Sequence, residues 1–153
     1  MRYLVVWLAA VPALFGQGRG SVAGTFGYAN FLDESAQHHM TFGGAARIYF
    51  TQRAAIEPEV TYLYRSAEDK DLLLQANVTR DLGKATGRAV PYVIAGAGRI
   101  WTFHPRFTVS SWTAGGGVGT RIFLTDRFFV APEVRLGTEP ILRLQISAGF
   151  ARR

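Results

Sequence analysis

One segment of this sequence occurs twice. Residues 43–61 read GGAARIYFTQRAAIEPEVT, and residues 117–135, 74 positions later, read GVGTRIFLTDRFFVAPEVR. In each copy a short polar turn, Thr51-Gln52-Arg53 or Thr125-Asp126-Arg127, separates two stretches in which apolar residues recur at every second position. That spacing is the period of a β-strand and not of a helix. Each copy therefore predicts one β-hairpin.

Similar stretches fill most of the chain. The predicted strands are 21–31, 38–50, 55–66, 72–82, 90–103, 109–124, 128–137 and 141–150. Strands of globular proteins usually have about 5 or 6 residues, whereas strands that cross a membrane need about 9 to 11. No stretch between them has the caps and the 3.6-residue period of a helix. We therefore predict an all-β chain, an eight-stranded antiparallel up-and-down transmembrane β-barrel, whose closure removes exposed strand edges.

The N-terminus has the pattern of a secretory signal peptide. Arg2 precedes an apolar run over residues 4–15, and Gly16-Gln17-Gly18 then supplies small residues for cleavage. The run is shorter than the roughly 20 apolar residues of a transmembrane helix. We therefore predict a cleaved signal peptide at 1–16 and one barrel domain at 17–153.

Charge distribution decides which face of each strand is inside. A central Arg or Lys that faces lipid costs about 2 to 4 kcal/mol, and several such costs would exceed a typical net stability of about 5 to 15 kcal/mol. The apolar faces should therefore point outward. The predicted outward residues include Phe42, Ile48, Phe50, Ile56, Val60, Tyr62, Leu72, Leu74, Val78, Tyr92, Ile94, Val118, Ile122, Val130, Val134, Leu142, Leu144 and Ile146. The predicted inward residues include Arg47, Glu57, Glu59, Arg65, Gln75, Asn77, Arg99, Arg121, Glu133, Arg135, Arg143 and Gln145.

The inward charges suggest a network in the lumen. Eight strands leave a lumen just wide enough for side chains to fill it. We expect Glu59 and Glu133 to pair first with Arg47 and Arg121 of the same hairpins, and inward Arg to outnumber inward Glu. An ion path is an alternative use of these residues, but the lumen size favours a closed plug of salt bridges. The predicted network comprises Arg47, Glu59, Arg99, Arg121, Glu133, Arg135 and Arg143.

Glycines and aromatic residues complete the predicted wall. Gly115, Gly117 and Gly119 should face the lumen, whereas Gly96, Gly98 and Gly116 should face lipid on neighbouring strands. Aromatic residues should form two girdles, with Phe50, Phe128 and Phe129 at the periplasmic interface and Tyr62, Tyr64, Trp101 and Trp112 nearer the outer one.

The repeated segment also resembles a known protein family. Each copy has a Gly-rich strand, then Arg-Ile-Tyr-Phe or Arg-Ile-Phe-Leu, a Thr-x-Arg turn and Pro-Glu-Val. This order of motifs is similar to the small bacterial outer-membrane β-barrel domain of outer membrane protein A and its relatives. The resemblance covers residues from about Gly20 to Phe150. It implies the outer membrane of a Gram-negative-type bacterium and assembly by the barrel-assembly machinery. Relatives typically end on an aromatic residue that this machinery reads, whereas here Ala151-Arg152-Arg153 follows Phe150.

The sequence offers little for chemistry. No nucleophile, base and acid share a recognisable local motif, adjacent His38 and His39 should point to opposite faces of a strand, and the Gly-rich stretches open no helix that could hold a phosphate. We therefore predict no catalytic, cofactor-binding or metal-binding residues. If the protein were an enzyme, its candidate catalytic residues would be the His and Ser residues near the outer strand ends, namely His38, His39, His104, Ser35, Ser110 and Ser111.

Charge and composition indicate the partners. The formal net charge of +6 comes from Lys and Arg residues scattered over strands and turns, so we predict no nucleic-acid partner. We expect a monomer with a structural, envelope-integrity or surface-contact role. The alternatives are a lipid-modifying outer-membrane enzyme and a soluble barrel that binds an apolar ligand. Outer-membrane lipids and lipopolysaccharide should meet the exposed groups of the outer loops, namely Asp33, Glu34, Asp69, Lys70, Asp71, His104 and Arg106.

Overall fold

The structure is a computed structural model. It describes residues 19–31, 37–66, 69–84, 86–104, 106–138 and 141–152. The predicted signal peptide at 1–16 and the loop residues Asp33, Glu34 and Ser35 lie outside these ranges. The strands are β1 (Gly20–Phe31), β2 (Gln37–Tyr49), β3 (Ala54–Ser66), β4 (Asp69–Asp81), β5 (Ala89–His104), β6 (Phe107–Phe123), β7 (Phe128–Gly137) and β8 (Ile141–Arg152). All eight predicted strands are confirmed, with ends within three residues of the predicted ones.

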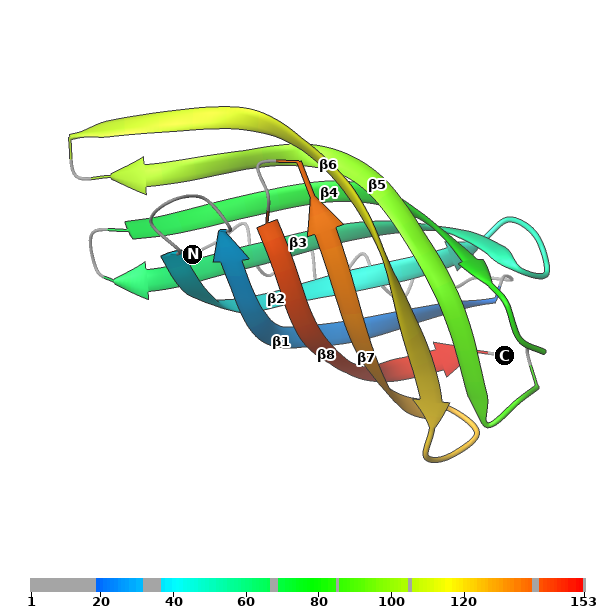
Figure 1. Cartoon of the computed structure of the whole chain (residues 1–153). Coiled ribbons are helices and arrows are strands. Elements are labelled where there is room, and N and C mark those ends of the chain that lie inside the picture. The colour runs from blue at the N-terminus through cyan, green and yellow to red at the C-terminus, as the bar shows by residue number, and fades with distance from the viewer. Residues whose placement is uncertain are drawn as a thin grey trace, which may run out of the picture.

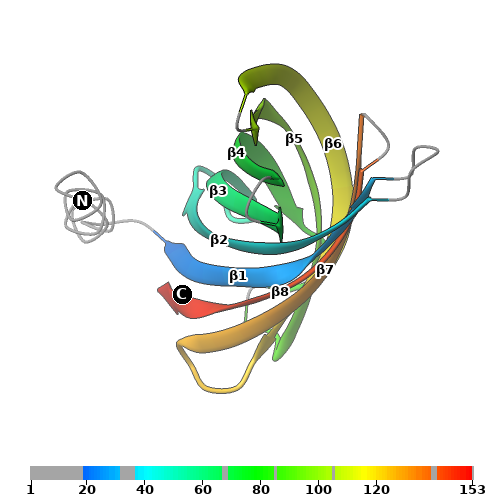
Figure 2. The same cartoon turned by 90° about the vertical axis from the view of Figure 1, so that its left-hand side faces the viewer.

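The strands form one closed antiparallel barrel, in which each strand pairs with the next and β8 pairs with β1 (Figures 1 and 2). The predicted fold class is confirmed. The described part of the chain contains no helix with the length and hydropathy of a membrane span. The register of the barrel is offset by ten residues when it closes. If one starts at Gly20 of β1 and moves each time to the paired residue of the next strand, the path ends at Asn30 of β1, ten positions further along the chain. The path runs through Ile48, Ile56, Val78, Ala95, Gly116, Leu136 and Leu142. Such an offset requires tilted strands, at about 35–45° to the barrel axis.

The two copies of the repeat make the same turn. In the first, Thr51 Oγ1 accepts hydrogen bonds from the N–H of Arg53 at 3.2 Å and of Ala54 at 2.8 Å. In the second, Thr125 Oγ1 accepts from the N–H of Arg127 at 3.4 Å and of Phe128 at 2.9 Å. A threonine side chain therefore stabilises each hairpin, as a local side-chain acceptor often does in turns.

Strand β6 extends beyond the end of β7. The pairing of β6 with β7 stops at Gly115 and Gly137, and Thr138 closes it, because its N–H donates to the Ala114 carbonyl at 2.7 Å and its Oγ1 accepts from the Ala114 N–H at 2.9 Å. The pairing of β6 with β5 continues to Phe107. Within the described ranges, residues 107–113 therefore pair on one side alone, and the β5–β6 hairpin projects past β7 (Figure 1).

Glycines face the lumen where neighbouring strands approach closely. A Cβ on Gly117 would lie 2.1 Å from the Val134 carbonyl oxygen, and one on Gly119 would lie 2.6 Å from the ring of Tyr92. On β5, a Cβ on Gly96 would meet the side chain of Asn77, which is buried inside the barrel. The prediction that Gly96 faces lipid is therefore wrong, and Gly98, two residues along the same strand, also faces the lumen.

Candidate functional site

The most distinctive site is the lumen, where charged side chains are buried among themselves. Glu59 has a relative exposure of 3% and Arg135 of 6%, whereas Val118 and Ile146 on the outer wall have 58% and 59%. Polar residues are thus inside and apolar residues outside, the reverse of a water-soluble domain. The structure places six of the seven residues of the predicted network in this lumen: Arg47, Glu59, Arg121, Glu133, Arg135 and Arg143.

Glu59 on β3 is the centre of the network. Its Oε1 accepts a hydrogen bond from Arg143 Nη1 at 3.0 Å and one from Thr61 Oγ1 at 2.8 Å. Its Oε2 lies 2.7 Å from Arg135 Nη1 and accepts from the Asn77 amide at 3.2 Å. Two guanidinium groups, one from β7 and one from β8, therefore meet one carboxylate of β3 across the lumen.

Glu133 on β7 forms a second centre. One of its carboxylate oxygens pairs with Nε of Arg135 and accepts from the Gln145 amide at 2.7 Å. The other oxygen accepts from the hydroxyl of Tyr92 at 2.7 Å. Because Arg135 contacts both Glu59 and Glu133, it joins the two centres into one network.

Two further ion pairs lie nearer the turn end of the barrel. Arg47 Nε donates to Glu57 Oε2 at 2.5 Å, and Arg121 Nη2 lies 2.5 Å from Asp81 Oδ1. The hydroxyl of Tyr49 also donates to Asp81, at 2.9 Å. The expected pairing of Arg47 with Glu59 and of Arg121 with Glu133 is therefore wrong, because each arginine takes a nearer carboxylate that the predicted network did not contain.

The lumen also contains buried aspartates that the predicted network did not include. In the described chain the buried acidic residues are Glu57, Glu59, Asp71, Asp81 and Glu133, and the buried arginines are Arg47, Arg121, Arg135 and Arg143. Buried arginine outnumbers buried glutamate, four to three, as predicted, but Asp71 and Asp81 bring the number of buried carboxylates to five. Asp71, which was expected among the exposed loop groups, is 3% exposed and lies with an oxygen 3.6 Å from Nε2 of the buried His39.

Apolar side chains close the network at both ends. Near the loops, one cluster comprises Ala29, Leu63, Leu73, Ile100 and Ile141. Near the turns, another comprises Val90, Phe123, Phe129, Ala131 and Ala151. Phe129 was expected at the lipid interface, but it lies inside this second cluster. Described residues of the lumen line two cavities of about 20 Å³ and one of about 10 Å³, each comparable to the space that one water molecule needs.

The side chains of β5 face the opposite way from the prediction. Tyr92 and Ile94 were expected outside but are buried inside, and Arg99 was expected inside but is exposed on the outer wall. Arg65, also predicted inward, is exposed near the end of β3, where the pairing with β4 shifts register. On β5 the apolar residues at 90–94 are consecutive, so the strand has no alternation there from which its faces could be read.

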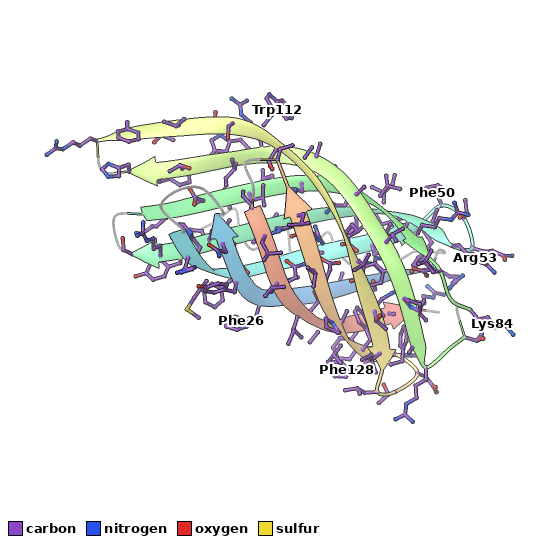
Figure 3. All side chains as sticks on the ribbon, viewed as in Figure 1. Phe26, Phe50, Arg53, Lys84, Trp112 and Phe128 are labelled. Carbon is purple, nitrogen blue, oxygen red and sulfur yellow. The ribbon has the colours of Figure 1, made fainter. Side chains whose placement is uncertain are left out.

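The outer wall carries aromatic residues toward both ends. Phe50 and Phe128 lie at the turn end, and Trp112 projects outward from β6 (Figure 3). Phe128 packs against Phe150 with ring centroids 5.3 Å apart. Tyr62 and Tyr64 are exposed on β3 toward the loops. Apart from Phe129, the aromatic side chains named for the two girdles therefore lie on the outside of the barrel or partly exposed in its wall.

The residues considered for catalysis do not assemble. His38 is exposed and stacks on Tyr28, with ring centroids 5.4 Å apart, while His39 is buried on the opposite face. His104 stacks on Phe107 at 4.7 Å, and Ser110 accepts a hydrogen bond from Arg99. No group of three or more metal-ligating His, Cys, Asp or Glu residues occurs in the described ranges.

The comparisons with known proteins concern the fold. No family model matches the sequence. No curated protein matches it either. The N-terminal β-barrel domain of OprF from Pseudomonas aeruginosa matches with a TM-score of 0.70 and 17% identity, over 89% of this chain and 100% of that domain.

Two other barrels match over similar lengths. Neisserial surface protein A (NspA) has a TM-score of 0.68 and 13% identity, over 86% of this chain and 95% of its own. Ail, the attachment invasion locus protein of Yersinia pestis, has a TM-score of 0.58 and 12% identity, over 88% and 99%. The resemblance to outer-membrane barrels is thus confirmed at the level of the fold. The chain has the fold of the small eight-stranded outer-membrane β-barrels.

Proposed function

We propose that this chain is an integral outer-membrane β-barrel of a Gram-negative-type bacterium, with a structural or surface-contact role and no enzymatic activity. The observation that carries the proposal is the inverted polarity of the barrel. Buried Arg and Glu inside a wall of exposed Val, Leu, Ile and Phe would be unstable in water, since soluble monomers rarely expose apolar patches larger than a few hundred Å². A lipid environment solvates that wall.

The lumen argues for a structural role over a transport role. Ion pairs and two apolar clusters fill the described part of the lumen, and the cavities between them have the size of single water molecules. A ligand-binding soluble barrel would need an apolar cavity and a polar exterior, which is the opposite arrangement. Two of the matching structures are Neisserial surface protein A and the attachment invasion locus protein of Yersinia pestis, and these names favour contact at the cell surface.

The test is membrane integration. Expressed with its own N-terminus in a Gram-negative host, the protein should stay in the outer-membrane fraction after alkaline carbonate washing. It should require detergent to remain monodisperse, and it should migrate differently on gels before and after boiling, as a folded barrel does. Release by carbonate, or a monodisperse protein without detergent, would overturn the proposal.

A further inference from the structure

Arg99 lies on the outer wall of the barrel, toward the loop end of β5. Its neighbours Gly98 and Ile100 face the lumen, so its side chain faces outward, where it is exposed. Nη2 donates a hydrogen bond to Ser110 Oγ at 2.7 Å. The guanidinium carbon lies 5.7 Å from the ring centroid of Trp101 and 5.8 Å from that of Trp112. The cation therefore lies within cation–π distance of two indole rings.

Strand pairing builds this arrangement from three strands. Arg99 on β5 is paired with Trp112 on β6 and with Leu74 on β4, and Trp101 is paired with Ser110 and with Leu72. Residues directly opposite one another in a pair of strands lie with their side chains on the same face. The guanidinium thus lies among indole and leucine side chains, and Trp112, which is 74% exposed, points away from the barrel (Figure 3).

Arg99 differs from the arginines of the lumen in its partners. Each of the four buried arginines contacts a carboxylate, whereas the described contacts of Arg99 are one hydroxyl and two aromatic rings. The outward-facing residues around it on β4, β5 and β6 include no Asp or Glu in the described ranges. They do include Lys70, which pairs with Phe103, the next outward residue of β5 after Trp101. The local surface is therefore cationic and aromatic.

The position of this group matches the headgroup level of a bilayer. Trp is enriched where membranes meet water, and a long Arg side chain can reach that level while its methylenes remain among apolar groups. An outward cation costs only about 0–1 kcal/mol near an interface, against about 2–4 kcal/mol at the midplane. A guanidinium has five N–H donors and binds phosphate oxygens in a bidentate manner. Ser110 uses one of those donors.

We propose that Arg99, Trp101, Ser110 and Trp112 form a binding site for the phosphate of an anionic lipid at the loop-side headgroup level, with Lys70 as a second cation. Arg99 donates to the phosphate oxygens, and the two indoles lie beside the guanidinium and contact the lipid. The proposal rests on the proposed function, because this wall faces lipid only if the barrel spans a membrane. The barrel fold alone does not indicate which lipid the protein binds or where it binds that lipid.

The tryptophan content of the chain supplies a direct readout. Its three tryptophans are Trp7, Trp101 and Trp112, so a full-length chain with Trp7→Phe fluoresces from the proposed site alone. This protein is reconstituted into phosphatidylcholine vesicles that contain increasing fractions of phosphatidic acid with brominated acyl chains. A parallel series uses brominated phosphatidylcholine. Bromine quenches adjacent tryptophan, so the two curves measure the relative affinity of the site for the two lipids.

We expect phosphatidic acid to be preferred about threefold, the scale of one exposed charged contact, and Arg99→Gln to reduce the ratio to about one. Arg80→Gln is the matched control, since it removes an exposed arginine from the same outer wall at the turn end of β4. It should leave the ratio unchanged. Heat-modifiable gel mobility checks that each variant is folded before the comparison.

The outcomes separate this inference from the proposed function. If brominated phosphatidylcholine does not quench at all, the barrel is not in the bilayer and the proposed function fails. If both lipids quench equally, or if Arg80→Gln lowers the preference as much as Arg99→Gln does, the site is overturned while the barrel stands. A change in tryptophan emission when inorganic phosphate is added to pure phosphatidylcholine vesicles would assign the site to free phosphate and overturn the lipid.

Discussion

Single carboxylates hold the interior of this barrel together. Glu59 contacts Arg135 and Arg143 from the opposite side of the lumen, and both arginines are buried with it. A buried ion pair adds little net stability by itself, because desolvation opposes the attraction between its charges. Removing one member is costly, however, because the other charge stays buried without compensation. The stability of the network therefore depends on its completeness.

Glu59→Gln should lower the free energy of unfolding by about 3 to 5 kcal/mol, the scale for breaking a buried pair. Urea titration of the protein in lipid vesicles, followed by heat-modifiable gel mobility, measures the change. Asp126→Asn is the matched control, since it removes an acid from an exposed turn and should change stability by no more than about 0.5 kcal/mol. Equal midpoints for the two variants would contradict the network.

Close packing at single glycines is the second residue-scale feature. The ring of Tyr92 lies over Gly119 and places its hydroxyl on Glu133. Gly119→Ala would put a Cβ 2.6 Å from that ring, so the ring must move and its hydrogen bond must lengthen. Overpacking of this kind costs about 1–3 kcal/mol.

The urea titration tests Gly119→Ala against Gly24→Ala, since Gly24 has no other atom within 4 Å of a Cβ built there. Only Gly119→Ala should be destabilised. Similar losses in both variants would show that the effect comes from glycine flexibility and not from contact with Tyr92.

At the scale of elements, the β5–β6 hairpin is unlike the other hairpins of the barrel. Residues 107–113 of β6 pair with β5 and, within the described ranges, with no strand on the other side. In an antiparallel strand, alternate residues direct their N–H and C=O groups to opposite sides. Since the backbone of Ala114 is directed toward β7, Thr108, Ser110 and Trp112 direct theirs toward the open edge.

Hydrogen exchange should therefore alternate along this segment. The amides of Thr108, Ser110 and Trp112 should exchange fast, whereas those of Val109, Ser111 and Thr113, which are directed toward β5, should be protected. NMR of the protein in detergent micelles resolves the individual amides. Uniform protection along 107–113 would show that this edge is covered.

At the scale of the whole molecule, side chains fill most of the lumen. Among the described residues, its two apolar clusters and its ion pairs enclose cavities of about 10 to 20 Å³, each with room for about one water molecule. An ion would have to pass both apolar clusters and displace paired charges, and water-filled channels occur in porins of 16–18 strands. We therefore expect the filled lumen to conduct no ions.

Planar bilayers that contain the protein should show no steady conductance steps. Leu63→Ala, which shortens a side chain of the loop-side cluster, should not open a channel, because the charged network and the turn-side cluster remain. Steady and reproducible single-channel steps from the unsubstituted protein, altered when Arg121 is replaced, would show an open lumen.

Residue order by itself determined the strands, their number and the inward face of the repeated hairpins. Apolar residues recur at every second position there, and Glu59, Glu133 and Arg135 mark the other face, so a barrel in lipid has one possible orientation for β3 and β7. The Thr-x-Arg turns follow from the same local information. Neither result requires knowing which strands meet across the lumen.

Tertiary structure decided the face of β5 and the partners inside. The apolar run at 90–94 suits either face, and the pairing of β5 with β4 and β6 sets Tyr92 inward and Arg99 outward. Glu59 and Arg143 are 84 positions apart in sequence and meet only because the barrel closes with an offset of ten residues. Closure and offset determine which side chains share a level of the lumen, and no local pattern encodes either one.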